Sequence, residues 1–113
     1  MNIFSSNSWA YLVAAILFEV AGTTSMKLSQ GFTRVFPSAL IFLFYGVAVM
    51  ALTLALKKID VSIAYAVWSG LGTALIAAIG MIWFREPVST IRLLSICLII
   101  IGIIGLNLGE MKF

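Results

Sequence analysis

The longest uncharged segment of the chain is residues 61–84, VSIAYAVWSGLGTALIAAIGMIWF. A helix that crosses the hydrocarbon core of a bilayer needs about 20 mostly apolar residues, and this segment meets that length without Asp, Glu, Lys or Arg. Residues 35–56 and 93–109 are also uncharged, and the first 26 residues carry one charged side chain, Glu19. The sequence therefore predicts an all-α membrane protein with a single transmembrane domain, 1–113, and four transmembrane helices near 9–28, 35–56, 61–84 and 91–109.

The composition excludes most other classes of protein. The 113 residues are 63% hydrophobic and 10% charged, with a mean hydropathy of +1.18. A soluble domain this short keeps much of its surface in water and normally has about 25% charged residues. The chain has no histidine and one cysteine, which excludes histidine-based catalysis, histidine metal ligation and an internal disulfide. We therefore expect neither an enzyme nor a bound metal or cofactor, and the scattered basic residues do not indicate a nucleic-acid partner.

Lysine and arginine residues near the ends of the spans do not favour one orientation in the membrane. With four spans, both tails and the middle loop share one side, which carries three basic residues, while the other two loops carry four. The positive-inside rule is therefore nearly balanced. Either other signals orient the chain, or the chain inserts both ways. Two copies of opposite orientation would then supply the inverted repeat on which many transporters are built.

Glu19 is the only ionisable residue deep within a predicted span. A charge at that depth costs on the order of 3 kcal/mol or more and usually marks an ion path. Residues three, four and seven positions away share its helical face, and none is basic: Leu12, Ala15, Ile16, Gly22, Thr23 and Met26. A proton or an organic cation can then neutralise the carboxylate, and the two compete. The alternative is a protonated acid that only links helices by hydrogen bonds.

Aromatic residues on two other predicted spans would complete a cation site. Tyr65 and Trp68 are three positions apart on the third span, and Tyr45 lies in the middle of the second. The faces of tyrosine and tryptophan rings attract desolvated cations by about 2 kcal/mol or more. Ordinary packing is the alternative role for each ring.

Small residues mark two further features. Gly70 and Gly72 interrupt the third span and predict either a bend or a close helix contact. The last span carries a stripe of small residues on one face, and such stripes allow membrane helices to approach closely. This stripe, which predicts a contact between subunits, comprises Ser95, Gly102, Gly105 and Gly109.

Four motifs occur at specific positions along the chain: EVAGTT at 19–24, GFTR at 31–34, AYAVWSGLG at 64–72, and Gly102 with Asn107. As a set they resemble the small multidrug resistance family of four-helix bacterial exporters, over nearly the whole chain. The resemblance implies an antiparallel, dual-topology dimer in the bacterial inner membrane. It also implies an exchange of protons for cationic substrates at a pair of glutamates shared by the two subunits.

The resemblance carries over to single residues by position. Glu19 resembles the membrane-embedded acid that binds both proton and substrate. The implied substrate contacts are Ala15, Ile16, Thr23, Tyr45, Tyr65 and Trp68. The implied conformational kink is at Gly70 and Gly72, and the implied dimer contact is Ser95, Gly102, Gly105 and Gly109. Two residues depart from the usual family pattern, which bears on helix packing and substrate preference: Ser95 replaces a common glycine, and Ala48 replaces a common hydroxyl residue.

Gly22, Thr23 and Thr24 after the acid, together with Tyr45, resemble the quaternary ammonium and multidrug subtype. The expected function is proton-coupled export of hydrophobic and quaternary ammonium cations, with organic cations, protons and membrane lipid as partners. A guanidinium exporter of the same build is the second hypothesis. The charge balance favours a homodimer, whereas the segment 57–60 is similar to one member of a paired heterodimer. A third hypothesis is a structural subunit, such as half of a lipid-carrier flippase, whose relatives generally lack the buried acid.

Overall fold

The computed structural model describes residues 3–110, which form four helices: α1 Ile3–Leu28, α2 Val35–Ala55, α3 Val61–Ile82 and α4 Thr90–Glu110. Each helix contains a segment long and apolar enough to cross a membrane. No strand occurs within residues 3–110. The predicted all-α architecture with four membrane-spanning helices is therefore confirmed.

The start of α1 differs most from the prediction. The helix begins at Ile3 rather than near residue 9. Hydropathy did not indicate the additional helical residues, 3–8, which are a mixture of apolar and polar residues. This segment contains neither glycine nor proline, the two residues that most strongly disfavour a helix, and the helix extends through it to Ile3.

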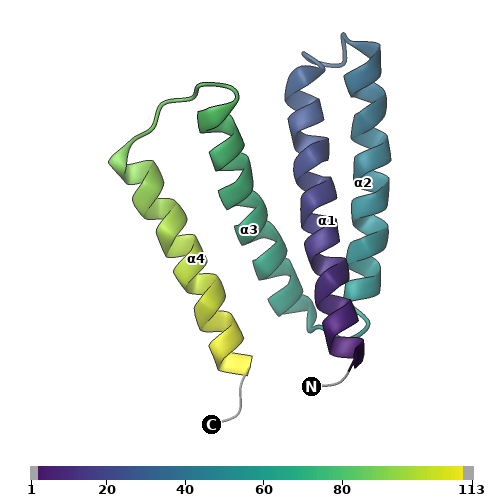
Figure 1. Ribbon diagram of the computed structural model, residues 1–113, viewed down its shortest axis with the longest axis vertical. Helices are drawn as coiled ribbons and strands as arrows, with labels where there is room; N and C mark the ends of the chain where they lie inside the picture. Colours follow the sequence, from purple (N-terminus) through teal and green to yellow (C-terminus); the bar gives the residue numbers. More distant parts are fainter. Residues whose placement is uncertain (1–2, 111–113) are drawn as a thin grey trace.

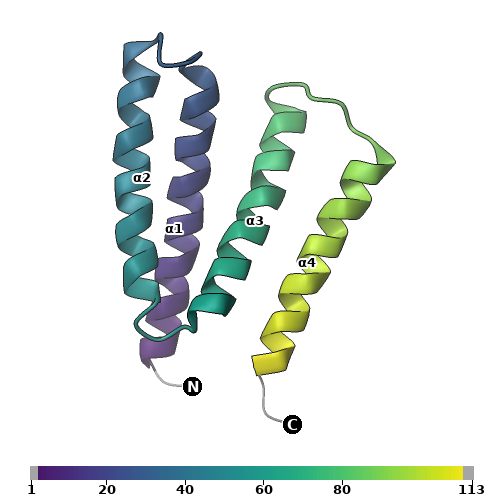
Figure 2. The same ribbon diagram turned by 180° about the vertical axis from the view of Figure 1, so that it is seen from behind.

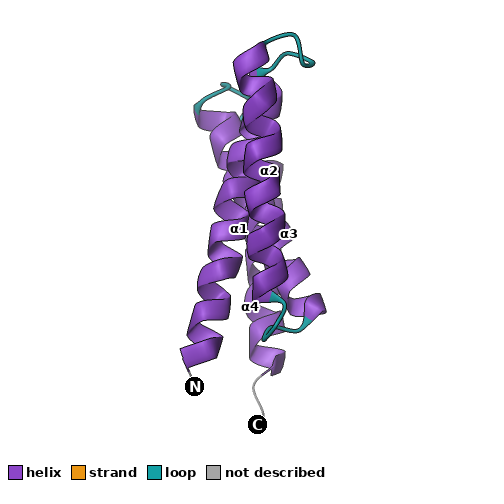
Figure 3. Cartoon of the chain, turned by 90° about the vertical axis from the view of Figure 1, so that its right-hand side faces the viewer, coloured by secondary structure: helices purple, strands orange, loops and turns teal. Residues whose placement is uncertain are grey.

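The helices lie side by side in the order α2, α1, α3, α4 (Figure 1, and from behind in Figure 2). The α1–α2 and α3–α4 loops lie at one end of this layer, and the α2–α3 loop lies at the other. The chain measures 50 × 35 × 17 Å along its principal axes, and Figure 3 shows how narrow it is from the side. Since one helix with its side chains is about 10 Å wide, a single chain forms an open layer.

A cluster of buried apolar residues joins α1 to α3. Its α1 members are Leu12, Ile16 and Val20, which are four residues apart and therefore share one helical face. The other members come from the end of α2, the loop after it and the first turns of α3: Ala55, Ile59, Ile63, Ala64 and Val67. This packing sets the height of α3 against α1, and it places Trp68 beside the part of α1 that carries Glu19.

The α1–α2 contact is very close at Gly22. A Cβ atom added to Gly22 would lie 2.7 Å from two ring carbons of Tyr45 and 3.4 Å from the Cβ of Phe44. A side chain at this position would displace the Tyr45 ring, so glycine allows the ring to lie against the α1 backbone. Small residues commonly let membrane helices approach in this way.

α4 is held less closely than the other helices. It meets α3 near Gly70, where an added Cβ would lie 2.5 Å from the Cδ1 of Ile103. None of its membrane-spanning segment is buried within the chain. The predicted small-residue stripe lies on this uncovered surface, with open space beside Gly102, Gly105 and Gly109 and with Ser95 exposed. A dimer contact there stays a prediction.

Candidate functional site

Glu19 lies at a pocket of about 350 Å³ between α1 and α3. The lining residues come from both helices: Glu19, Thr23, Tyr65, Trp68, Ser69, Gly72, Thr73 and Ile76. Most α3 members recur three or four positions apart, so they share one face of that helix. Among the described residues, no three His, Cys, Asp or Glu side chains group closely enough to hold a metal ion. Glu19 is the one charged residue among the described residues that line the pocket.

Two hydroxyl groups hold one oxygen of Glu19. Thr23 Oγ1 donates a hydrogen bond of 3.0 Å to Glu19 Oε1, and the Tyr45 hydroxyl donates one of 3.2 Å to the same atom. The two hydroxyl oxygens also lie 2.6 Å apart, and either can be the donor. Each hydroxyl carries a single hydrogen, so three contacts share two protons. The network can therefore rearrange when the charge on Glu19 changes.

The other oxygen of Glu19 faces α3. A Cβ atom added to Gly72 would lie 3.4 Å from Glu19 Oε2, so the absent side chain leaves room at this point of the pocket. No described residue donates a hydrogen bond to Oε2, and no described lysine or arginine forms an ion pair with Glu19. The carboxylate therefore has one oxygen held by hydroxyls and one that a proton or cation can reach.

Tyr65 and Trp68 form the aromatic wall of the pocket. Their ring centroids are 5.4 Å apart and the ring planes are inclined at 66°, an edge-to-face arrangement. Tyr65 is exposed, whereas Trp68 is half-buried and packs against the α1–α3 core. The Trp68 Nε1 atom is buried and has no hydrogen-bond acceptor among the described residues. A buried donor without an acceptor costs free energy, so an acceptor supplied by a bound molecule or a second chain would stabilise this arrangement.

Three residues expected to contact a substrate do not line the pocket. Ala15 and Ile16 are almost completely buried, with exposed fractions of 0% and 2%, and neither lines the pocket. Tyr45 does not line it either, although its hydroxyl contacts Glu19. Helical periodicity placed Ala15 and Ile16 near the acid correctly, but it could not show that packing covers them. Their contact with a substrate stays a prediction.

Gly70 and Gly72 lie within an uninterrupted helix. Gly70 faces α4 and Gly72 faces Glu19, so each occupies a close contact. A conformational kink at these glycines stays a prediction. Three residues that line the pocket were missed in the sequence: Ser69, Thr73 and Ile76. Their spacing from Tyr65 and Trp68 could have indicated them, because residues four and eight positions apart share a helical face.

A second pocket of about 340 Å³ continues from the first along the α1–α3 groove. The two pockets share Thr23, Thr73 and Ile76, so they form one groove. Its outer end lies at the α3–α4 loop, beside the side chains of Glu86 and Arg92. Neither residue was predicted from the sequence to belong to a site.

Comparison with known proteins agrees with this architecture. Residues 7–99 match the family model for the Small Multidrug Resistance protein. The chain is 57% identical to the uncharacterized membrane protein YvaE of Bacillus subtilis, over 91% of this chain and 87% of that protein. It is 43% identical to the quaternary ammonium compound-resistance protein QacE of Escherichia coli, over 88% and 91% of the two chains. It is 44% identical to the multidrug resistance protein EbrB of Bacillus subtilis, over 86% and 83%. The chain is thus a multi-pass bacterial membrane protein that belongs to the small multidrug resistance family.

Proposed function

We propose that the chain exports hydrophobic and quaternary ammonium cations in exchange for protons, and that proton and cation compete for Glu19. The observation that carries the proposal is the setting of the Glu19 carboxylate. Its Oε1 accepts hydrogen bonds from Thr23 and Tyr45, while its Oε2 faces α3 without a described donor. The pocket at this carboxylate also contains the rings of Tyr65 and Trp68.

Competition for one carboxylate couples the two fluxes. A bare charge within the membrane is costly, so the carboxylate is most stable when it holds either a proton or a cation. A proton removes the negative charge that attracts the cation, and a bound cation favours the ionised carboxylate. Each ligand therefore lowers the affinity for the other by the same factor. A membrane potential of 100 mV contributes about 2.3 kcal/mol for each net charge moved.

The pocket supports an aromatic or alkylated cation as cargo. Aromatic faces attract desolvated cations, and a pocket of about 350 Å³ is much larger than a guanidinium ion. The names of QacE and EbrB refer to quaternary ammonium and multidrug resistance. A guanidinium exporter of the same build is the second candidate. Competition between guanidinium and a bulky quaternary ammonium ion for binding to the purified protein separates the two.

The open layer of helices supports an antiparallel homodimer of opposite membrane orientations. One chain leaves the spanning part of α4 uncovered, and the basic residues are balanced at three against four on the two sides. A second copy in the inverted orientation would place two Glu19 residues around one pathway. A paired heterodimer is the alternative, and it predicts that this chain alone does not transport.

Reconstitution of the purified chain in liposomes tests the proposal. With an imposed proton gradient, the wild-type protein should accumulate a labelled quaternary ammonium ion, and Glu19→Gln should not. The matched control is Asp60→Asn, which makes the same acid-to-amide change at the exposed start of α3 and should transport normally. Full activity in Glu19→Gln would overturn the mechanism. Activity of the wild type only after a second family member is added would favour the heterodimer.

A further inference from the structure

The outer end of the α1–α3 groove holds a second carboxylate, that of Glu86. The pocket there has a volume of about 340 Å³ and is lined partly by apolar side chains, including that of Phe84. Because it shares three residues with the Glu19 pocket, a cation that enters from the α3–α4 loop would pass Glu86 before it reaches Glu19.

The α3–α4 loop folds back so that Glu86 lies against the end of α3. The backbone N–H of Glu86 donates a hydrogen bond of 2.9 Å to the carbonyl oxygen of Gly80. A Cβ atom added to Gly80 would collide with the Glu86 carboxylate. Glycine at position 80 therefore provides the space that this carboxylate occupies. The loop places the acid by two contacts with one residue of α3.

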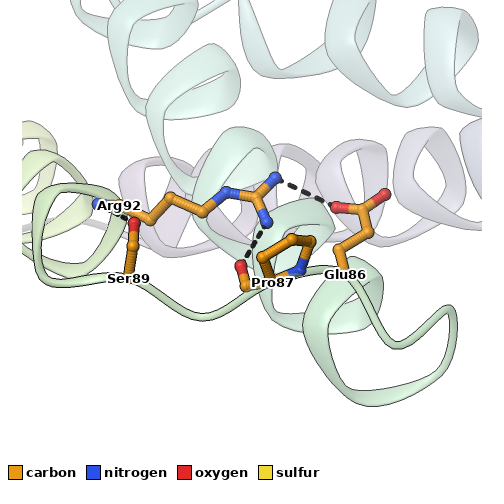
Figure 4. Close-up of polar contacts among 4 residues, drawn as sticks. All are labelled: Glu86, Pro87, Ser89 and Arg92. Carbon is orange, nitrogen blue, oxygen red and sulfur yellow. Dashed lines mark hydrogen bonds and ion pairs between the residues drawn. The ribbon is translucent and has the colours of Figure 1, made fainter.

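A guanidinium group already occupies the acceptors at this point. Arg92 Nη2 donates a hydrogen bond of 3.1 Å to Glu86 Oε1, and Arg92 Nη1 donates one of 2.6 Å to the carbonyl oxygen of Pro87 (Figure 4). The backbone N–H of Arg92 also donates to Ser89 Oγ at 3.1 Å, which fixes the start of α4 beneath the guanidinium. A carboxylate and a carbonyl oxygen thus form a site with the shape of a planar, forked donor.

We propose that Glu86 and the Pro87 carbonyl form an outer binding site for guanidinium-type cations, which Arg92 occupies when no such cation is bound. A free guanidinium compound replaces the Arg92 side chain, occupies the same two acceptors and can then move along the groove. The choice of ligand rests on the proposed function, because guanidinium is its second candidate cargo. The site itself is defined by the Arg92 contacts and is separate from Glu19.

The Arg92–Glu86 pair is suited to exchange. Each of the two side chains is 40% exposed, and exposed ion pairs contribute little net stability. A tethered group acts as a competitor at an effective concentration in the millimolar range. The weak Arg92–Glu86 pair should reduce the apparent affinity for a free guanidinium compound by about fivefold. Removing the Arg92 side chain should therefore raise that affinity by the same factor.

Lys27 is a second basic residue at this end of the groove. The positive charge of Lys27 opposes the binding of a cation, whereas the Glu86 carboxylate favours that binding. Neutralising the two residues should therefore change the affinity in opposite directions. Lys27→Gln should strengthen guanidinium binding at the outer site, while Glu86→Gln should weaken it by about tenfold or more, because hydrogen bonds to charged groups are the strong ones.

Titration of the purified full-length protein with guanidinium chloride tests the site, with sodium chloride at equal ionic strength as the reference. The titration uses a Glu19→Gln background, so that the inner carboxylate cannot contribute. The backbone amide signals of Gly80 and Glu86, followed by nuclear magnetic resonance, report on the site. Adding Arg92→Ala should increase the apparent affinity about fivefold, whereas adding Arg34→Ala, at the same end of the molecule, should not.

A second cation and a second variant test which chemical groups the site recognises. Tetramethylammonium has no N–H donor and should shift these amides at least several-fold less than guanidinium does. If Arg92→Ala does not fold, the Glu19→Gln protein is compared with the same protein that also carries Glu86→Gln. Only the protein that retains Glu86 should show amide shifts with guanidinium. Equal responses to the two cations, or a guanidinium response that persists in Glu86→Gln, would overturn the outer site. Because Glu19 is absent throughout, neither result bears on the proposed exchange at Glu19.

Discussion

The Tyr45 hydroxyl of α2 donates a hydrogen bond to Glu19 Oε1 of α1, although Tyr45 does not line the pocket at which Glu19 lies. The tyrosine thus contacts the carboxylate from the α2 side, while the pocket lies on the α3 side. This geometry leads us to expect that Tyr45 positions the acid. It differs from the expectation that all three aromatic residues form one wall around a cation.

Tyr45→Phe should weaken cation binding by about fivefold. The change removes one hydrogen bond to Glu19 Oε1, worth about 1 kcal/mol, and leaves Thr23 as the remaining hydroxyl donor. The Glu19 side chain is then less restrained in the position that binds the cation. Equilibrium binding of a quaternary ammonium ion to the protein in detergent measures the effect. An unchanged or tighter affinity would show that the hydroxyl does not position Glu19.

Gly22→Ala should destabilise the α1–α2 contact by about 1–3 kcal/mol, the usual cost of overpacking. The added Cβ would lie 2.7 Å from the Tyr45 ring, so the ring or the helix must move. Cation affinity should fall at least as far as in Tyr45→Phe. Gly46→Ala is the matched control, because open space surrounds that glycine on α2. Thermal unfolding in detergent compares the variants, and equal stability of the two would contradict the packing argument.

Trp68→Ala should weaken the binding of aromatic cations by about tenfold or more, since a desolvated cation–π contact is worth about 2 kcal/mol. Guanidinium should be affected less, because it presents less surface to the ring. Trp83→Ala is the control; Trp83 stacks on Phe84 at the end of α3 and does not line the Glu19 pocket. Equal losses for large and small cations would count against an aromatic wall.

Gly105→Leu should reduce the dimer fraction without loss of helix content. Within the described part of the chain, nothing lies within 4 Å of a Cβ added at this position, so we expect a larger side chain to obstruct another molecule. Ile104→Ala, at an exposed position on another face of α4, should leave the dimer intact. Chemical cross-linking in liposomes, with circular dichroism as the measure of helix content, makes the comparison. A dimer that tolerates Gly105→Leu would place the subunit contact elsewhere.

The sequence was sufficient to predict the four spans, because three uncharged runs bounded by charged residues are long enough to cross a bilayer, and the first span carries few charged residues along a similar length. The sequence was also sufficient to predict that Glu19 shares a helical face with Thr23, and Tyr65 with Trp68, because the residues of each pair are separated by one helical turn. Periodicity assigns residues to a face, and the structure brings these two faces together in one pocket.

Other features depend on contacts that periodicity does not specify. Ile16 shares the face of Glu19, but the register between α1 and α3 buries it. The contact between Gly22 and Tyr45 depends in the same way on how α2 is placed along α1. The pairing of Glu86 with Arg92 depends on the path of an irregular loop, which residue spacing alone does not indicate.

The central claim is that one carboxylate alternately holds a proton and a cation. The most direct measurement is proton release when a quaternary ammonium ion binds to the detergent-solubilised protein in weak buffer, followed with a pH indicator. At a pH where Glu19 is partly protonated, the account predicts that binding releases protons from the wild type and none from Glu19→Gln. Cation binding without proton release, or proton release that persists in Glu19→Gln, would contradict it.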